Sequence, residues 1–495
     1  MTGIVHVIAL AIFGLSSLLL IPILVALGQG EGGLAGIMLI FSTLGIFVSI
    51  VILAAIADLE YNLSRSLSFV SLLSLWLITS LVGAFSFMVF LNMPLGAAWF
   101  ESVAALTTSG GSLISKSASS QTMLVWRACM EWYGGFLTLV SVLHILAPGE
   151  FGGLINTERT LRPKSGNKTW LPDSSGYQRL ITEYVIITLL IAVGLMASGV
   201  TSLNSMMLSM VAIATGGFTP FEGALDENVG RFGQFVIIIG LLVGTLNIFW
   251  RRSIIRSPRT FLRKNVELNY ILVALLVLSL VYGFRYASLA GSERSAENAL
   301  LHILEGLFSA TSLIATSGME TRPGAIAVLP DVLVLAVVLI GASIYSTTGG
   351  IKIYRIAMMA AHALRELKKL IHPTSVQNLR FGEVVIDEQK MAAIWSHFIL
   401  SLILVGIGAF LISFFGFSFD AAATLAIALF SNAAPIYDAL IPTLSEISLA
   451  EGVAWPSLSD GNTLSYIVFS ALMLVGRLEV IAVFAVLNFR YWLNR

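Results

Sequence analysis

The chain has 495 residues, of which 57% are hydrophobic and 11% are charged, and its formal net charge at pH 7 is zero. Soluble domains carry about 25% charged residues, so this composition excludes an ordinary soluble protein and indicates a polytopic membrane protein. The single cysteine, Cys129, excludes an internal disulfide and a cysteine-based metal site.

Apolar runs long enough to cross a bilayer recur along the chain, and we predict about ten spans from them. In chain order they are residues 5–27, 34–55, 68–91, 124–146, 180–197, 232–250, 268–286, 332–356, 391–415 and 464–493. The first run lacks a basic flank and a cleavage-like site, which favours a retained helix over a signal peptide.

Basic residues predict the orientation of these spans. If the N-terminus is cytoplasmic and the spans alternate, most of the 28 Lys and Arg residues fall in cytoplasmic loops. The positive-inside rule therefore predicts a multi-pass protein with a cytoplasmic N-terminus.

A short polar stretch interrupts the apolar pattern four times. Its copies are "ALTTSGG", "AIATGGF", "LIATSGM" and "LFSNAAP". Each follows a short amphipathic helix such as residues 95–106 or 298–315, and helices of this length indicate re-entrant segments because they cannot cross a bilayer. Aligning Thr108, Thr215, Thr316 and Asn432 gives spacings of 107, 101 and 116 residues, as expected for one unit used repeatedly.

We therefore predict an all-α membrane protein built from four units, each a span, a short helix, a polar turn and a second span. The predicted divisions are 1–60 for two extra N-terminal helices, then 61–165, 166–264, 265–388 and 389–495 for the four units. Backbone that leaves the helical conformation at membrane depth must line a water-filled path or be packed in protein. Four turns around a pseudo-fourfold axis favour a cation pore, in which carbonyl oxygens replace the hydration shell of the ion. The alternative is that small residues merely permit close helix packing.

Longer stretches carry a family resemblance. They are "LTTSGG", "VWRACMEWYGGFLTLVSVLHILAP", "YSTTGGIKIYRI", "ELKKLIHPTSVQNLRFGEVVID" and "MLVGRLEVIAVFAVL". Together they resemble the Trk/Ktr/HKT superfamily of potassium transporters, specifically its TrkH-type bacterial potassium uptake subunits. The resemblance implies membrane-pore-membrane repeats, potassium (K⁺) as the transported ion, location in the cell inner membrane, and a homodimer. It also implies a cytosolic RCK-type nucleotide-binding regulatory subunit that docks near residues 365–390, where contact with lipid headgroups is the alternative.

The resemblance also assigns the filter. It places the ion-facing backbone carbonyls on Thr108, Ser109, Thr215, Gly216, Thr316, Ser317, Asn432 and Ala433. Glycines at 110, 217 and 318 are expected to shape the turns, because residues with a Cβ resist the required backbone angles. Family members have glycine where this chain has Ala434. An alanine forced to positive φ costs about 1–2 kcal/mol, unless the turn takes another shape.

A second interruption, "GASIYSTTGGIKIY" at residues 341–354, suggests unwound backbone that lines a cavity. The resemblance makes it an intramembrane gating loop, with gate residues Thr347, Thr348, Gly349, Gly350 and Lys352. A kink in a packed helix is the alternative. Arg477, midway along the last predicted span, is interpreted as an electrostatic gate, with an interhelical ion pair as the alternative.

Acidic residues lie in or beside the short helices. Glu101, Glu305 and Asp420 are predicted either to attract cations to the outer mouth or to satisfy helix N-termini. The chain has no HExxH, GxSxG, Walker A or GxGxxG motif, which predicts no enzyme activity and no organic cofactor. Nothing suggests a nucleic-acid partner.

Several functional alternatives stay open at this point. Within transport, Ala434 motivates a weakly selective Na⁺/K⁺ or ammonium pathway. From a different class, the chain could be a non-conducting membrane sensor with a pore-like fold. The sequence also leaves open whether transport is channel-like or a symport coupled to H⁺ or Na⁺.

Overall fold

The computed structural model describes residues 2–59, 65–117, 119–142, 174–247, 250, 265–289, 296–372, 380–381, 384–441, 455–478 and 480. The α-helices are α1 (Thr2–Leu18), α2 (Leu20–Gly28), α3 (Gly32–Ala55), α4 (Arg65–Leu91), α5 (Leu95–Leu106), α6 (Gln121–Ser141), α8 (Ser174–Ala197), α9 (Ser202–Ile213), α10 (Leu225–Thr245), α13 (Val266–Leu289), α14 (Ala296–Ile314), α15 (Asp331–Ile340), α16 (Ile353–Ile371), α17 (Glu388–Ser413), α18 (Phe419–Phe430) and α20 (Thr463–Arg477). The chain also has two short 3₁₀ turns, η4 (Ile326–Val328) and η5 (Leu458–Asp460), and residues 435–441 are helical as well.

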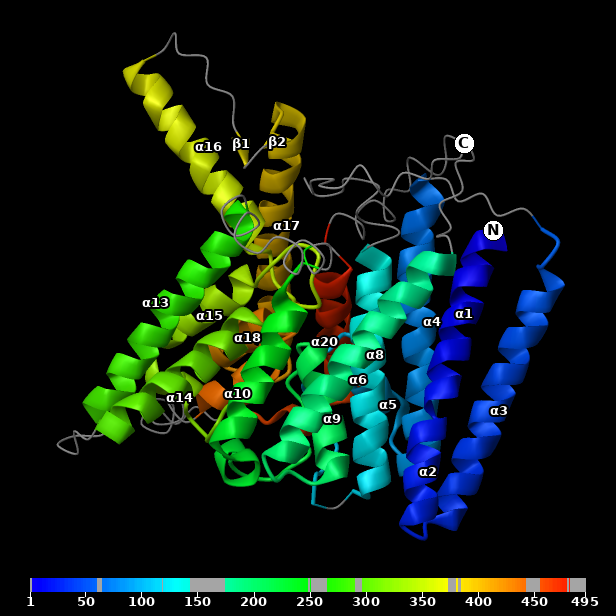
Figure 1. The fold of residues 1–495 in the computed structure, drawn as a ribbon. Helices are drawn as coiled ribbons and strands as arrows, with labels where there is room; N and C mark the ends of the chain where they lie inside the picture. The colour runs from blue at the N-terminus through cyan, green and yellow to red at the C-terminus, as the bar shows by residue number, and fades with distance from the viewer. Residues whose placement is uncertain are drawn as a thin grey trace.

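The prediction of an all-α fold is confirmed. The strands in the described part of the chain are one antiparallel pair, β1 (Arg380–Phe381) and β2 (Val384–Val385), with Arg380 opposite Val385. The pair follows α16, whose far end extends beyond the helical body in Figure 1.

One predicted span is broken in the structure. The span predicted over 332–356 is two helices, α15 and α16, separated by a non-helical segment at 341–352. The span predicted over 5–27 is one continuous stretch, Thr2–Gly28, in which Leu19 between α1 and α2 keeps helical angles although Pro22 has no N–H to donate to the preceding turn. The last parts of the spans predicted over 124–146 and 464–493 lie outside the described residues.

Side-chain burial follows the pattern of a membrane protein. Seven helical stretches within the described residues are long and apolar enough to span a bilayer. Large apolar side chains on them are exposed, as Leu190, Leu276 and Phe410 illustrate, while serines and threonines such as Ser102 and Thr311 are fully buried. The chain is therefore a multi-pass membrane protein with an apolar surface and a partly polar interior.

Each of the four short helices that precede the polar turns packs between two other helices of its own repeat. The contacts join α5 to α4 and α6, α9 to α8 and α10, α14 to α13 and α15, and α18 to α17 and α20. Side-chain caps begin several of these helices: Ser418 accepts from the N–H of Ala421 at α18, and Asn462 accepts from Ser465 at α20. The arrangement carries the C-terminal ends of α5, α9, α14 and α18 into the protein interior (Figure 1).

Candidate cation pathway

The four short helices end in the same hydrogen-bonded turn. At the end of α5, the N–H of Thr108 donates to the carbonyl of Ala105 (3.0 Å), and the N–H of Ser109 donates to Ala104 (2.9 Å). This pair of bonds is a Schellman motif, which satisfies the last carbonyls of a helix and places one residue in the left-handed conformation. The same pair of bonds ends α9, α14 and α18, with the left-handed residue at Thr215, Thr316 and Asn432.

The left-handed residue of each turn is not a glycine. The φ angles of Thr108, Thr215, Thr316 and Asn432 are 57°, 54°, 53° and 53°. Such an angle is an outlier for a β-branched residue, with a cost of about 1–3 kcal/mol. The turns therefore take a left-handed angle first at Thr or Asn and, in the first and third turns, again at the glycine two residues later.

The expected glycines have two different roles. Gly110 and Gly318 are left-handed, at φ 77° and 70°. Gly217 lies outside the left-handed region, but a Cβ there would overlap the carbonyl oxygen of Ser317 and lie 2.6 Å from Cγ of Pro435. Handedness therefore favours glycine at Gly110 and Gly318. Lack of space excludes a side chain at Gly217 and also at Gly110, where a Cβ would lie 2.6 Å from Cα of Gly217.

The four turns contact one another in a closed ring. A Cβ on Gly110, in the first turn, would lie 2.6 Å from Cα of Gly217, in the second. The hydroxyl of Ser317 in the third turn donates to the carbonyl of Gly216 (2.5 Å). A Cβ on Gly318 would lie 3.1 Å from the nitrogen of Ile436, just after the fourth turn. The ring closes where Ala434 donates its N–H to the carbonyl of Ser109 (2.8 Å).

These bonds divide the carbonyls expected to face an ion into two groups. Those of Ser109 and Gly216 accept the bonds just described, and that of Ala433 accepts from the N–H of Ile436 (3.0 Å). Within the described residues, no hydrogen bond reaches the carbonyl of Ser317 or those of the four left-handed residues, Thr108, Thr215, Thr316 and Asn432. Buried carbonyls of this kind need a partner, and a dehydrated cation is one.

Ala434 is not strained. Its φ is negative, so the fourth turn takes the other shape that the sequence left open. Its methyl group instead limits the first turn, because a Cβ on Gly111 would lie 2.8 Å from it. The alanine therefore carries no left-handed strain.

A cavity of about 360 Å³ opens beside this ring. Residues that follow all four turns line it, including Gly111, Phe218, Met319 and Pro435. We call this cavity the vestibule. It gives water and ions a path to one side of the ring of turns.

Charged groups of both signs line the vestibule. The ammonium of Lys116 donates to the hydroxyl of Thr219 (2.8 Å) and lies in the field of Asp438 and Glu222. The protein that surrounds this concave mouth raises the pKa of Asp438 to about 6, although the side chain itself is exposed, and the positive charge of Lys116 opposes the shift. Burial also raises the pKa of Glu320 to about 7, although its carboxylate accepts from the N–H of Ile326 (2.9 Å).

The segment at 341–352 packs against the opposite side of the ring. The hydroxyl of Thr347 lies 3.1 Å from that of Thr215, and the N–H of Gly349 donates to the hydroxyl of Thr316 (2.8 Å). A Cβ on Gly349 would overlap the carbonyl oxygen of Ser431 beside the fourth turn. The segment therefore touches three of the four turns.

The segment is held by its own backbone and by Lys352. Gly341 and Gly350 are left-handed at φ 63° and 76°, and Lys352 shares that region at φ 85°. The Lys352 ammonium donates to the carbonyls of Thr348 and Gly349. These contacts make one compact loop of the segment.

Arg477 reaches the same loop from α20. Its Nη1 donates to the carbonyl of Thr347 (2.6 Å), and its Nε donates to the hydroxyl of Thr138 on α6 (2.8 Å). Its Nη2 is buried and has no hydrogen-bond partner among the described residues. The interhelical ion pair offered as an alternative does not form with any described residue, because the partners of Arg477 are uncharged.

Sequence reasoning missed Glu267 and Thr138. The buried Glu267 carboxylate, near the start of α13, accepts from the N–H of Ile344 (2.9 Å) and so anchors the loop from another helix. The rarity of carboxylates within apolar spans is a signal that could have identified Glu267. Thr138 carries no such signal, because threonines are frequent in helices of this kind.

The acidic residues of the short helices lie in different environments. Glu101 is fully buried and paired with Arg127 (2.6 Å). Glu305 is partly exposed and pairs with Arg322 at the vestibule (3.1 Å). Asp420 lies in the first turn of α18. Two roles were predicted for these residues, attraction of cations to the outer mouth and satisfaction of helix N-termini. Glu101 fits neither role, because it is buried and paired with Arg127.

Comparison with known proteins places these features in context. Residues 294–490 match the TrkH family, described as a cation transport protein. The chain is 26% identical over 431 residues to the Trk system potassium uptake protein TrkH of Escherichia coli (strain K12), covering 84% of each. It is 25% identical over 448 residues to the TrkH protein of Vibrio parahaemolyticus, covering 88% of this chain and 87% of that protein. The crystal structure of the potassium transporter TrkH from Vibrio parahaemolyticus superimposes with a TM-score of 0.84 at 21% identity, over 99% of both chains, which shows the shared fold.

Proposed function

Because the chain belongs to the Trk/Ktr/HKT superfamily of potassium transporters, we propose that it takes up potassium through a pore formed by the four helix-ending turns. One observation carries this proposal. Four equivalent left-handed residues meet in a closed ring, and their carbonyls have no other partner among the described residues.

The helix ends supply the electrostatics of the proposed filter. Each of α5, α9, α14 and α18 carries a partial negative charge at its C-terminal end, equivalent to about half an elementary charge. All four ends are buried at the ring, so their dipoles favour a cation there. The ion-holding carbonyls are those of Thr108, Thr215, Thr316 and Asn432. The carbonyls of Ser109, Gly216 and Ala433, together with the hydroxyl of Ser317, then serve chiefly to fix the ring.

The loop at 341–352 is the proposed gate. It lies against the second, third and fourth turns on the side away from the vestibule, so an ion leaving the filter meets it first. Arg477 adds a positive charge and a direct bond to Thr347 at the same place. Movement of the loop together with Arg477 would open the path.

The proposal also covers the orientation of the chain in the membrane and its assembly with other subunits. The N-terminus and the free end of α16 lie on one side of the molecule (Figure 1), and the distribution of basic residues supports a cytoplasmic location for that side. On α16, Leu367 and Leu370 are exposed beside Lys368 and Lys369, which suits docking of a cytosolic RCK-type subunit. A homodimer in the cell inner membrane completes the proposal.

Uptake by intact cells tests this function. Potassium-starved cells that lack their own uptake systems would express the wild type or Ala434→Gly, and rubidium uptake would be measured with and without competing sodium. We expect saturable uptake that sodium competes with only weakly in both, because Ala434 has no left-handed strain to relieve. Selectivity that appears only in the glycine variant would favour a weakly selective pathway in the wild type. Absence of flux from both, with protein in the membrane and a regulatory subunit supplied, would favour a non-conducting sensor.

A further inference from the structure

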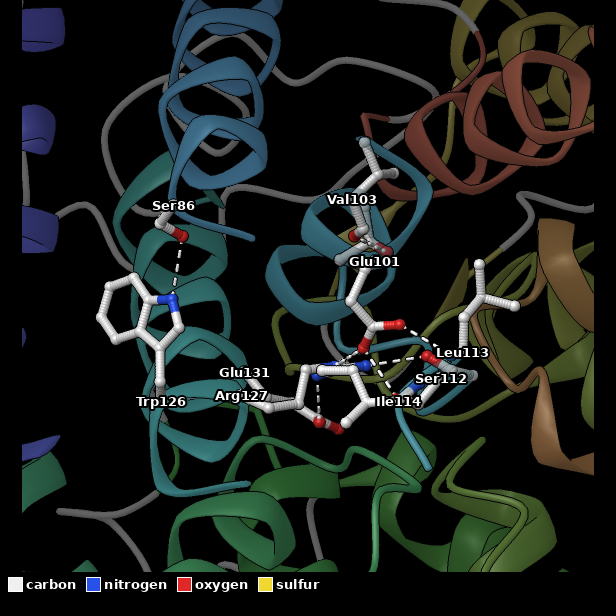
Figure 2. A network of polar contacts seen from close by, with 11 residues as sticks. Ser86, Glu101, Val103, Ser112, Leu113, Ile114, Trp126, Arg127 and Glu131 are labelled. Carbon is white, nitrogen blue, oxygen red and sulfur yellow. Dashed lines mark hydrogen bonds and ion pairs between the residues drawn. The ribbon is translucent and has the colours of Figure 1, made fainter. Parts of the chain in front are cut away.

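Three charged side chains are buried together beside the filter. They are Glu101 on α5 and Arg127 and Glu131 on α6, and all three side chains are completely inaccessible to solvent. Figure 2 shows Arg127 between the two carboxylates. Buried charges are costly unless each is paired, so a cluster of this kind indicates a specific structural demand.

Arg127 uses all three guanidinium nitrogens for separate partners. Its Nε donates to Oε1 of Glu101 (2.6 Å), and its Nη1 donates to Oε2 of Glu131 (2.8 Å). Its Nη2 donates to the carbonyl of Gly111 (2.9 Å), two residues beyond Ser109. The planar fork of arginine suits three acceptors in fixed directions, whereas the point charge of lysine does not.

Glu101 holds the same segment of the first repeat. Its Oε2 accepts from the N–H of Leu113 (2.7 Å), and its Oε1 accepts from the hydroxyl of Ser112 (2.8 Å). The three consecutive residues that leave the first turn, at 111–113, are therefore each fixed by one bond to the charged cluster (Figure 2).

The cluster also reaches the second repeat. The guanidinium carbon of Arg127 lies 5.3 Å from the ring centroid of Phe218, within the range of a cation–π contact. The remaining oxygen of Glu131, Oε1, is also buried, and the carboxylate lies beside the backbone of Phe218. A Cβ on Gly216 would overlap that oxygen. Gly216 has no positive φ, so the nearby carboxylate explains the absence of a side chain there.

The equivalent positions in the other repeats are uncharged. Seven residues before the left-handed residue, where the first repeat has Glu101, the others have Leu208, Ser309 and Leu425. The Glu305–Arg322 pair of the third repeat is partly exposed, and only Arg322 of the two lines the vestibule. It therefore offers a matched control pair.

We propose that Glu101, Arg127 and Glu131 form a charged clamp that sets the spacing between the first and second turns and thereby determines ion selectivity. The clamp residues are positioning residues, since they reach the carbonyl ring through Gly111 and Gly216. This inference rests on the proposed function, because selectivity presupposes a conducting filter.

The test compares Arg127→Lys with the wild type and with Glu305→Gln. Lysine keeps the positive charge but carries all its donors on one nitrogen, so it cannot reproduce the three separate donor positions of the guanidinium. We expect the rubidium-over-sodium uptake ratio of Arg127→Lys to fall by about tenfold, the change that loss of one charge-assisted hydrogen bond makes in an equilibrium. The ratio of Glu305→Gln should stay within about twofold of the wild type, as for an exposed pair. A wild-type ratio in Arg127→Lys would overturn the clamp.

A binding measurement tests the clamp without relying on transport. Purified wild-type protein should unfold at a higher temperature in potassium than in equimolar sodium, and Glu131→Gln should lose most of that difference. Retention of the full potassium effect in Glu131→Gln would also overturn the clamp, whether or not transport is observed. A wild type with neither potassium-dependent stabilisation nor flux would overturn the proposed function and the clamp together.

Discussion

Replacing Arg477 with methionine is expected to open the proposed gate without a regulatory subunit. Methionine occupies similar space but removes both the bond to the Thr347 carbonyl and the bond to the Thr138 hydroxyl. The loop then loses its connection to α20, while its contacts with Thr215, Thr316 and Glu267 remain. The perturbation is therefore confined to one of several restraints on the loop.

The magnitude follows from the bond that is lost. A hydrogen bond from a charged donor contributes about 1.5–3 kcal/mol, so loss of the bond to Thr347 removes about 2 kcal/mol from the closed state. That amount shifts the ratio of closed to open loop by roughly 30-fold, since each 1.36 kcal/mol is a factor of ten. Loss of a buried positive charge beside a cation path acts in the same direction, because it lowers the electrostatic barrier.

The assay is rubidium uptake by cells without the regulatory subunit, normalised to the amount of protein in the membrane. Arg477→Lys separates the two effects, since it keeps the charge but cannot reach both Thr347 and Thr138. Thr138→Val is a second control that leaves the bond to Thr347 in place. Uptake by Arg477→Met that equals or falls below the wild type would refute the assignment of Arg477 to the gate.

Three further predictions concern the vestibule and the loop. Acidification of the outer medium from pH 8 to pH 5.5 should protonate two vestibule carboxylates, because the surrounding protein raises the pKa of both. Glu320 loses its charge as the pH falls through about 7, and Asp438 loses its charge as the pH falls through about 6. The KM for rubidium should therefore rise by roughly threefold as the vestibule attracts cations less, and Glu320→Gln/Asp438→Asn should flatten the profile. Thr316→Val removes the acceptor of the Gly349 N–H, so basal uptake should rise about fivefold, whereas Thr316→Ser should behave as the wild type. Gly349→Ala would place a methyl group against the Ser431 carbonyl and displace the loop, so basal uptake should rise. Gly406→Ala is the matched control, because a Cβ at Gly406 meets open space. Equal uptake by the two variants would contradict the packing argument.

Local signals were enough to predict the helices and their polar turns. A short apolar helix followed by a polar turn is readable in one window of sequence, and α5 is found where it was predicted, at Leu95–Leu106. The break between α15 and α16 was likewise visible as polar and glycine residues within an apolar run. Composition and span length were also enough to identify a multi-pass membrane protein.

Features that depend on distant parts of the chain were not predictable in this way. Glycine preferences pointed to Gly110 as the strained residue, whereas the ring of contacts also places Thr108 in the left-handed region. The position of Glu131 against Gly216 and the bond from Ile344 to Glu267 each join separate repeats or helices. No window of sequence contains both partners, so only the assembled fold reveals them.

The two kinds of glycine in the turns have a consequence for how such chains are recognised. Gly110 and Gly318 are left-handed, Gly217 and Gly110 lack room for a side chain, and Ala434 has a negative φ that an alanine adopts without strain. Substitutions are therefore expected to have different effects at these four positions, although they occupy the same place in the four turns. A search pattern that insists on glycine at all four would discard sequences whose fourth turn is geometrically sound.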